Sequence, residues 1–247
     1  MLGYNCRYIS LPKRGNAIKE NEDNLIIATD IKDSVIKFAV ADGATESSFS
    51  KEWSCLLVSY FKDYSFDKLH FEQTLKMAAA SWQSRVDSIS LPWYAELKAE
   101  MGAHATFLGI TIDRENNLYE AWSIGDCMLF HIRDNKLLQS FPFTRADAFS
   151  NTPDLIPSKW QDINKITQKI VSTEGSVMSQ DHLILATDAI AAWIFKEIEQ
   201  AGIPWNVLTA LTDEGENTDK FEEWLEQERN TRQIKNDDVT LILINFT

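Results

Sequence analysis

The chain has 247 residues, of which 44% are hydrophobic and 11% aromatic, and its 37 acidic against 24 basic residues give a net charge of −13. This composition can bury a large core and excludes intrinsic disorder. The negative charge disfavours binding to nucleic acid or to an anionic membrane. It suits either a well-solvated surface or a protein that concentrates divalent cations.

The three cysteines, Cys6, Cys55 and Cys127, are far apart and form no CxxC pair, which disfavours a disulfide framework or a thiolate zinc site. The N-terminal residues lack a basic flank followed by an apolar core, as a signal peptide would have. No apolar run approaches the ~18 residues that a membrane span needs. We therefore expect a cytoplasmic protein with reduced thiols.

The first third of the chain predicts two strands followed by two helices. Apolar runs over residues 25–29 and 35–41 are typical of strands, with a short polar turn between them. Large apolar residues then recur at helical spacing over 49–61 and again over 69–86.

The middle of the chain predicts an antiparallel meander. Turn signals separate four expected strands at 105–112, 118–124, 127–132 and 136–140. The stretch 141–162 is less regular and holds three of the six prolines. We expect it to form a surface flap that governs the choice of substrate, because loops on a rigid scaffold usually carry specificity.

The last third predicts a buried strand at 182–187, a helix through 193–198, short helices around 205–211 and 220–229, and a central strand at 239–246. Strands and helices that occur in separate blocks favour the α+β class. Two packed antiparallel sheets with helices on the outside would accommodate every segment.

Five aspartates lie at the ends of expected strands or at the turn between two of them: Asp23, Asp42, Asp126, Asp188 and Asp237. A buried carboxylate beside a hydrophobic strand end costs free energy unless a cation neutralises it. Magnesium and manganese prefer such oxygen ligands. Gly43, which has no Cβ, would let a backbone carbonyl approach the same cation. Taken singly, each aspartate could equally cap a turn.

The motifs around these aspartates resemble, in chain order over residues 15–246, those of the metal-dependent protein phosphatases of type 2C. The six motifs are 21–23 (Asn-Glu-Asp), 38–43 (Phe-Ala-Val-Ala-Asp-Gly), 102–106 (Gly-Ala-His-Ala-Thr), 123–126 (Ser-Ile-Gly-Asp), 185–188 (Leu-Ala-Thr-Asp) and 236–240 (Asn-Asp-Asp-Val-Thr). The resemblance implies one catalytic domain over 1–247, built as an α-β-β-α sandwich.

The resemblance also implies the site. Its catalytic residues would be the metal ligands Asp23, Asp42, Asp188 and Asp237, joined by the Gly43 carbonyl. Asp126 would contribute to a third, weaker metal site, and Glu22 would support Asp23. The implied cofactors are two Mg²⁺ or Mn²⁺ ions, with a third ion at the weaker site. Two such ions lower the pKa of a bridging water, so no cysteine, serine or histidine nucleophile is needed.

Several accessory positions depart from the family pattern. Ile18 stands where the family usually has a phosphate-binding arginine, and Arg14 or Lys19 is the candidate substitute. Ala44 stands where many relatives carry a histidine that can act as general acid. His104 could donate that proton, or it could be an ordinary strand histidine. Further departures are Cys127, Met128 and Ala189.

The sequence therefore predicts a monomeric serine/threonine protein phosphatase that depends on magnesium or manganese. Its partners would be a phosphorylated protein and the cognate Ser/Thr kinase, with no role for nucleic acid or membrane. The alternative is a catalytically weak member that serves as a regulatory binding module, which the accessory departures favour. The retained carboxylates argue against it, because they repel one another once metal is lost. A phosphatase of small phosphorylated metabolites is a third reading.

Overall fold

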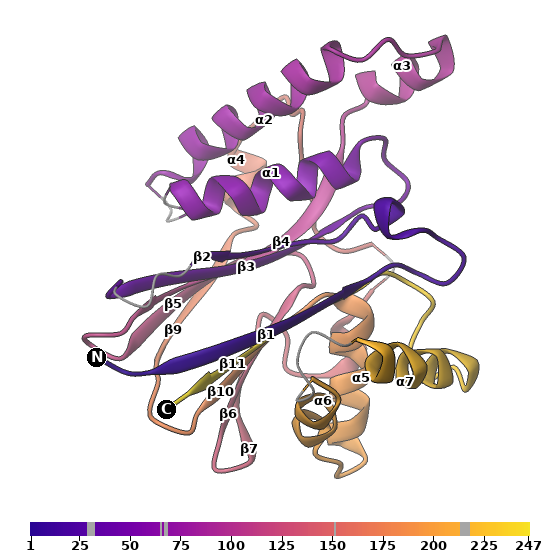
Figure 1. Cartoon of the computed structure of the whole chain (residues 1–247). Helices are drawn as coiled ribbons and strands as arrows, with labels where there is room; N and C mark the ends of the chain where they lie inside the picture. Colours follow the sequence, from indigo (N-terminus) through magenta and orange to yellow (C-terminus); the bar gives the residue numbers. More distant parts are fainter. Residues whose placement is uncertain (29–32, 65, 67–68, 151, 213–217) are drawn as a thin grey trace.

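The computed structural model describes residues 1–28, 33–64, 66, 69–150, 152–212 and 218–247. Two antiparallel sheets pack face to face, and helices cover both outer faces (Figure 1). The predicted α+β sandwich is therefore confirmed. In the described part of the chain, no helix is long and apolar enough to cross a membrane.

The first sheet has five strands in the order β1-β11-β10-β6-β7. These strands are β1 (Tyr4–Leu11), β6 (Met128–Arg133), β7 (Lys136–Phe141), β10 (His182–Ala186) and β11 (Val239–Phe246). The second sheet has the order β2-β3-β4-β5-β9, with β8 paired to β4. Its strands are β2 (Asn24–Ala28), β3 (Val35–Gly43), β4 (His104–Asp113), β5 (Leu118–Ile124), β8 (Ile156–Pro157) and β9 (Val171–Ser176).

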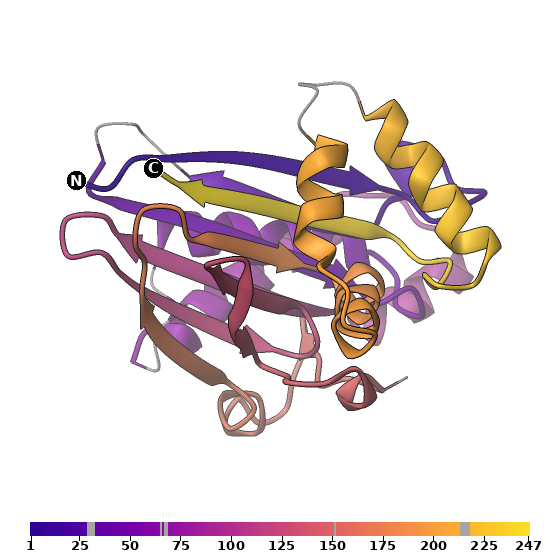
Figure 2. The same cartoon turned by 90° about the horizontal axis from the view of Figure 1, so that it is seen from below.

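Three helices lie on the outer side of the second sheet: α1 (Ser50–Asp63), α2 (Phe71–Asp87) and α3 (Trp93–Glu100). Three others lie against the first sheet: α5 (Asp188–Glu199), α6 (Pro204–Thr212) and α7 (Asp219–Asn230). Short helices complete the structure: η1 (Ile18–Glu20), η2 (Ala146–Ala148) and α4 (Asn164–Thr167). Both termini lie at one end of the strands, and α7 lies at the opposite end (Figure 2).

Each sheet is buried on both faces, which explains the near-continuous apolar runs of its central strands. In β3, Phe38 and Val40 enter the core between the sheets, whereas Ala39 and Ala41 pack in the cluster under α1 and α2. β11 follows the same alternation, with Ile242 and Ile244 facing the other sheet. The alternate residues Leu241 and Leu243 join the cluster beneath α5.

The structure contains elements that the sequence did not predict. β1 is an edge strand that pairs with β11 from Tyr4 to Leu11, and its mixture of polar and apolar residues hid it. β9, at an edge of the second sheet, is also largely polar and exposed. The expected flap at 141–162 contains η2 and β8, and β8 attaches it to the start of β4.

Candidate metal centre

Strand pairing brings the predicted aspartates of the second sheet together. β2 pairs with β3 so that Asn24 lies opposite Ala41. The residues just beyond this pair are Asp23 and Asp42, which therefore sit side by side at the end of the sheet. Each repels the other's negative charge, and this repulsion contributes to the raised pKa of Asp42.

The first sheet brings two further aspartates to the same end. β10 pairs with β11, and the Thr187 backbone N–H donates to the Thr240 carbonyl at 3.0 Å. Asp188 follows at the first position of α5, and Asp237 lies in the loop before β11. Lys235 joins the two carboxylates, because its Nζ lies 2.6 Å from Asp237 Oδ2 and 3.8 Å from Asp188 Oδ2.

Asp126 lies in the turn that carries the chain from β5 in one sheet to β6 in the other. The preceding Gly125 has a φ of +98°, and a Cβ there would lie 2.5 Å from the Thr106 side chain. Only glycine can occupy this position without strain. The turn places Asp126 at 3% exposure, close enough for Asp188 to raise its pKa.

The carboxylates share one space and oppose one another's ionisation. Burial is the largest cause of the raised pKa of Asp23, Asp42, Asp126 and Asp188, and repulsion by neighbouring aspartates adds to it. The pKa of Asp126 rises to about 7. Four others repel the Asp42 carboxylate: Asp23, Asp188, Asp126 and Asp237. Asp42 thus lies at the centre of the cluster.

Three buried carboxylate oxygens have no hydrogen-bond partner among the described residues: Asp23 Oδ1, Asp126 Oδ1 and Asp188 Oδ1. An unsatisfied buried acceptor costs roughly 1–3 kcal/mol. The other oxygen of Asp23 is held, because Thr187 Oγ1 donates to Oδ2 at 2.9 Å. One oxygen is therefore oriented by the protein while its neighbour stays free. Unshared carboxylate oxygens are the donors that Mg²⁺ and Mn²⁺ prefer, so these residues fit such ions.

The described aspartate side chains do not form a closed set of metal ligands in this structure. Among the described residues, no three His, Cys, Asp or Glu side chains form a group that could hold a metal ion. Lys235 lies beside the carboxylates instead, with 65% of its side chain exposed. Cation binding would therefore require this lysine to move and the carboxylates to draw together.

Glu22 braces the loop that carries Asp23. Ser50 Oγ, at the start of α1, donates to Glu22 Oε1, and Thr45 Oγ1 donates to Oε2 at 2.7 Å. Lys13 Nζ lies 3.5 Å from the same oxygen. The side chain thus joins the loops before β2 and after β3.

Asp238 has a different environment from its neighbour Asp237. Its two oxygens accept the backbone N–H groups of Lys13 and Glu22, each at 2.7 Å. The Asp238 carboxylate therefore fixes the loop between β1 and β2. The metal-ligand role of Asp237 at this motif stays a prediction.

Gly43 is surrounded by backbone. A Cβ at this position would lie 2.9 Å from the Glu22 carbonyl oxygen and equally close to the carbonyl group of Ser50. Real Cβ atoms do not approach backbone so closely, so the start of α1 and the Glu22 loop could not keep their places around a larger residue. The close approach gives Gly43 a packing role in addition to its predicted role as a carbonyl ligand.

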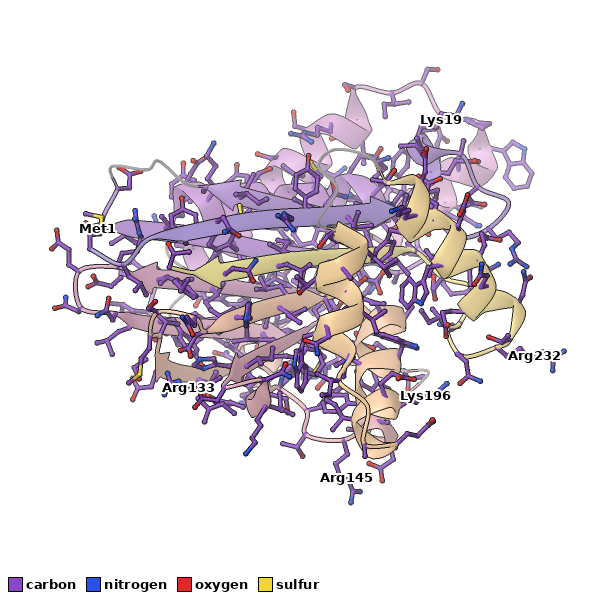
Figure 3. The ribbon with its side chains drawn as sticks, turned by 60° about the horizontal axis from the view of Figure 1, so that its bottom comes forward. Met1, Lys19, Arg133, Arg145, Lys196 and Arg232 are labelled. Carbon is purple, nitrogen blue, oxygen red and sulfur yellow. The ribbon has the colours of Figure 1, made fainter. Side chains whose placement is uncertain are left out.

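The predicted phosphate-binding residues are Arg14 and Lys19. Arg14 Nε donates to Glu226 Oε2 at 2.6 Å, and its Nη2 donates to Asn230 Oδ1 at 2.8 Å. Arg14 is thus bound to α7. Lys19 is exposed on η1, at the end of the molecule away from Met1 (Figure 3).

Two lysines that the sequence did not single out lie beside acidic side chains of the site. They are Lys13, beside Glu22, and Lys235, beside Asp188 and Asp237. No sequence signal marks either residue, because each reaches the cluster through contacts that only the fold creates.

His104 begins β4 on the other side of Gly43. Its carbonyl accepts the Ala44 N–H at 2.9 Å, and its own N–H donates to Ser47 Oγ at 3.1 Å. Burial lowers the pKa of its imidazole. The residue therefore holds the loop after Asp42 against β4 while its half-buried ring is neutral at pH 7.

The sequence matches no protein-family model and no curated protein sequence. Solved structures nevertheless match along the whole chain. The photosystem II phosphatase PBCP matches with a TM-score of 0.61 at 15% identity over 98% of both chains. The catalytic domain of the serine/threonine phosphatase PstP with two manganese ions matches at 0.56 and 17% identity, over 99% of this chain and 100% of that one. RsbX in complex with magnesium matches at 0.54 and 16% identity over all of both chains.

These similarities establish the fold: the chain has the architecture of the type 2C protein phosphatases. At 15–17% identity they extend to the fold alone. Two of the three structures hold manganese or magnesium.

Proposed function

We propose that this chain is a magnesium- or manganese-dependent phosphatase that hydrolyses phosphoserine and phosphothreonine in proteins. The observation that carries the proposal is the group of mutually repelling buried aspartates, three of which have an oxygen with no hydrogen-bond partner in the described part of the chain. A protein that leaves such atoms unsatisfied loses stability unless a cation joins them. The fold of the metal-dependent phosphatases supports the same conclusion.

The proposed ligands are Asp23, Asp42, Asp188 and Asp237 with the Gly43 carbonyl, and Asp126 for a third ion. Bound Mg²⁺ or Mn²⁺ would supply Lewis-acid chemistry and activation of water at neutral pH. The residues around the ligands orient them, as Thr187 does by holding one oxygen of Asp23. The proposed substrate is a phosphorylated protein, which implies a cognate kinase. We propose that the protein works as a cytoplasmic monomer.

One observation favours a second candidate, a regulatory binding module with little catalysis. Lys235 already neutralises part of the cluster, and the described side chains form no closed ligand set. A lysine that permanently replaced the cation would leave the fold intact and remove the chemistry.

Hydrolysis assays separate these candidates. We expect para-nitrophenyl phosphate and a phosphothreonine peptide to be hydrolysed with manganese and not with EDTA. Asp188→Asn should remove this turnover, because it takes away one ligand charge at an unpartnered oxygen. Asp134→Asn is the matched control, since Asp134 is exposed in a turn with a φ of +51° that asparagine tolerates. Turnover that is absent in the wild type despite measurable manganese binding would favour the regulatory module.

Kinetics should also identify the phosphate-binding residue. We expect Lys235→Ala to raise KM for the phosphopeptide about tenfold, as the loss of a charged hydrogen bond does. Arg14→Ala should raise it less, because Glu226 and Asn230 already bind the guanidinium. Lys136→Ala, at an exposed position of β7, is the control. A large rise in Arg14→Ala with none in Lys235→Ala would return the role to Arg14.

A further inference from the structure

Two adjoining hollows lead away from the candidate metal centre. The first has a volume of about 250 Å³ and begins at Ala44, directly after Asp42 and Gly43. The second has a volume of about 550 Å³ and lies along the flap and α4. His104 and Leu155 line both hollows. A chain segment bound at the carboxylates could therefore continue through one hollow into the other.

The first hollow offers apolar contacts. Ala44, Leu155 and Met101 line it, and 76% of Met101 is exposed. Trp93 and Leu97, which lie two turns and one turn before Met101 in α3, are 73% and 55% exposed. Residues spaced by four lie on one helix face, so these three form an apolar stripe that ends at the hollow. Exposed apolar surface of this kind marks interaction sites.

The second hollow is basic although the whole chain is strongly acidic. Lys159, Lys165 and Lys169 line it. Lys159 is held in place by the Ala99 carbonyl at 3.2 Å, and its ammonium lies over the Trp82 ring. Lys165 is exposed.

Acidic groups at the second hollow offset only part of this charge. Lys169 pairs with Asp154 at 2.7 Å, but the two side chains are 44% and 56% exposed, so water screens the pair. Asp162 also lines the hollow, where its carboxylate accepts both the backbone and side-chain N–H groups of Asn164. The hollow therefore keeps net positive charge and complements an acidic ligand.

We propose that the two hollows form one docking groove for the substrate segment that flanks the phosphorylated residue. A bulky apolar side chain next to that residue would occupy the first hollow, and acidic residues further along would lie against the lysines of the second. This inference rests on the proposed function, because the phosphorylated residue would be held at the carboxylate cluster. It deepens that function by naming a substrate class: phosphoproteins with an apolar and then acidic sequence beside the phosphorylated site.

The test compares two phosphothreonine peptides that share a phenylalanine next to the phosphorylated residue. One continues with aspartates and the other with lysines, and para-nitrophenyl phosphate reports the metal site alone. We expect wild type to prefer the acidic peptide, with a preference that weakens at high salt. Lys165→Glu should lower kcat/KM for the acidic peptide by about three- to tenfold, as one reversed surface charge does. Turnover of para-nitrophenyl phosphate should not change.

Matched controls exist for both hollows. Lys136→Glu reverses an exposed charge on β7, and Met101→Glu is matched by Met178→Glu, since 55% of Met178 is exposed. Neither control should alter the peptide preference, whereas Met101→Glu should reduce turnover of the phenylalanine-containing peptide. Equal turnover of both peptides, or equal effects of Lys165→Glu and Lys136→Glu, would overturn the docking groove.

The outcomes also separate this inference from the proposed function. If wild type fails to hydrolyse para-nitrophenyl phosphate with manganese, the phosphatase proposal fails. Fluorescence anisotropy of the labelled acidic peptide then still measures binding to the groove, since binding does not require turnover. Binding that Lys165→Glu weakens and Lys136→Glu leaves unchanged would support the groove by itself, and no measurable binding would overturn it.

Discussion

Asp42→Ala is expected to abolish the rise in melting temperature that millimolar manganese gives the wild-type protein. An ion that binds only the folded state stabilises it by about 2.7 kcal/mol at a hundredfold excess over Kd. For a chain of this size, that corresponds to a rise of roughly 5–10 °C. Asp42 interacts with four other aspartates, so its removal takes the central carboxylate from the cluster.

In EDTA, the same substitution should not lower the melting temperature. Without a cation, Asp42 is repelled by its neighbours and its burial disfavours the ionised form. Asp42→Ala should therefore melt at or above the wild-type temperature in EDTA and below it in manganese. Differential scanning fluorimetry in both buffers measures this reversal, with Asp134→Asn as the control. A wild-type melting curve that manganese leaves unchanged would rule out the metal centre.

Much of the fold could be predicted because the central strands are buried on both faces. The run around Phe38 and Val40, and the one around Ile242, read as strands for that reason alone. β1 was missed since its burial comes from pairing with β11 at the far end of the chain. α3 was missed because its large apolar residues Trp93 and Leu97 are exposed, as is Met101 directly after it, so no buried stripe marks the helix. Long-range pairing and exposed apolar surface leave little periodic signal in one sequence.

The sequence likewise allowed part of the candidate site to be predicted and not the rest. The aspartates could be placed because each stands beside a predictable strand end, and pairing β2 with β3 and β10 with β11 then brings them together. The basic residues could not be placed from the sequence, because a lysine reaches the cluster through a flexible side chain from a loop. Lys235 is the clearest case: its neighbours Asp188 and Asp237 are brought to it by the packing of α5 beside β11.

The raised pKa of these buried aspartates also has a thermodynamic consequence. A carboxyl group whose pKa is higher in the folded than in the unfolded state binds more protons when folded. Between the two values, the free energy of unfolding therefore falls as pH rises. For Asp126 this window runs from 3.8 to about 7. Asp23, Asp42 and Asp188 act in the same direction.

Asp126→Asn is therefore expected to stabilise the metal-free protein more at pH 8 than at pH 4. Above pH 7 the wild-type carboxylate is ionised, buried and repelled by Asp188, whereas asparagine keeps the shape without the charge. Each unit of pKa difference is worth about 1.4 kcal/mol, so the extra stabilisation at pH 8 should be on the order of 2–4 kcal/mol.

The comparison of variant with wild type isolates this effect from the histidines. Burial lowers the pKa of His104 and His131, so their contribution to stability grows as pH rises and opposes that of the aspartates. Both proteins contain these histidines. Their contribution therefore cancels when the free energies of unfolding, measured with urea, are subtracted from one another. Manganese should reverse the order at pH 8, because a cation binds the ionised wild-type carboxylate and gains less from asparagine. A stability difference between variant and wild type that stays constant from pH 4 to pH 8 would show that folding does not raise the pKa of Asp126.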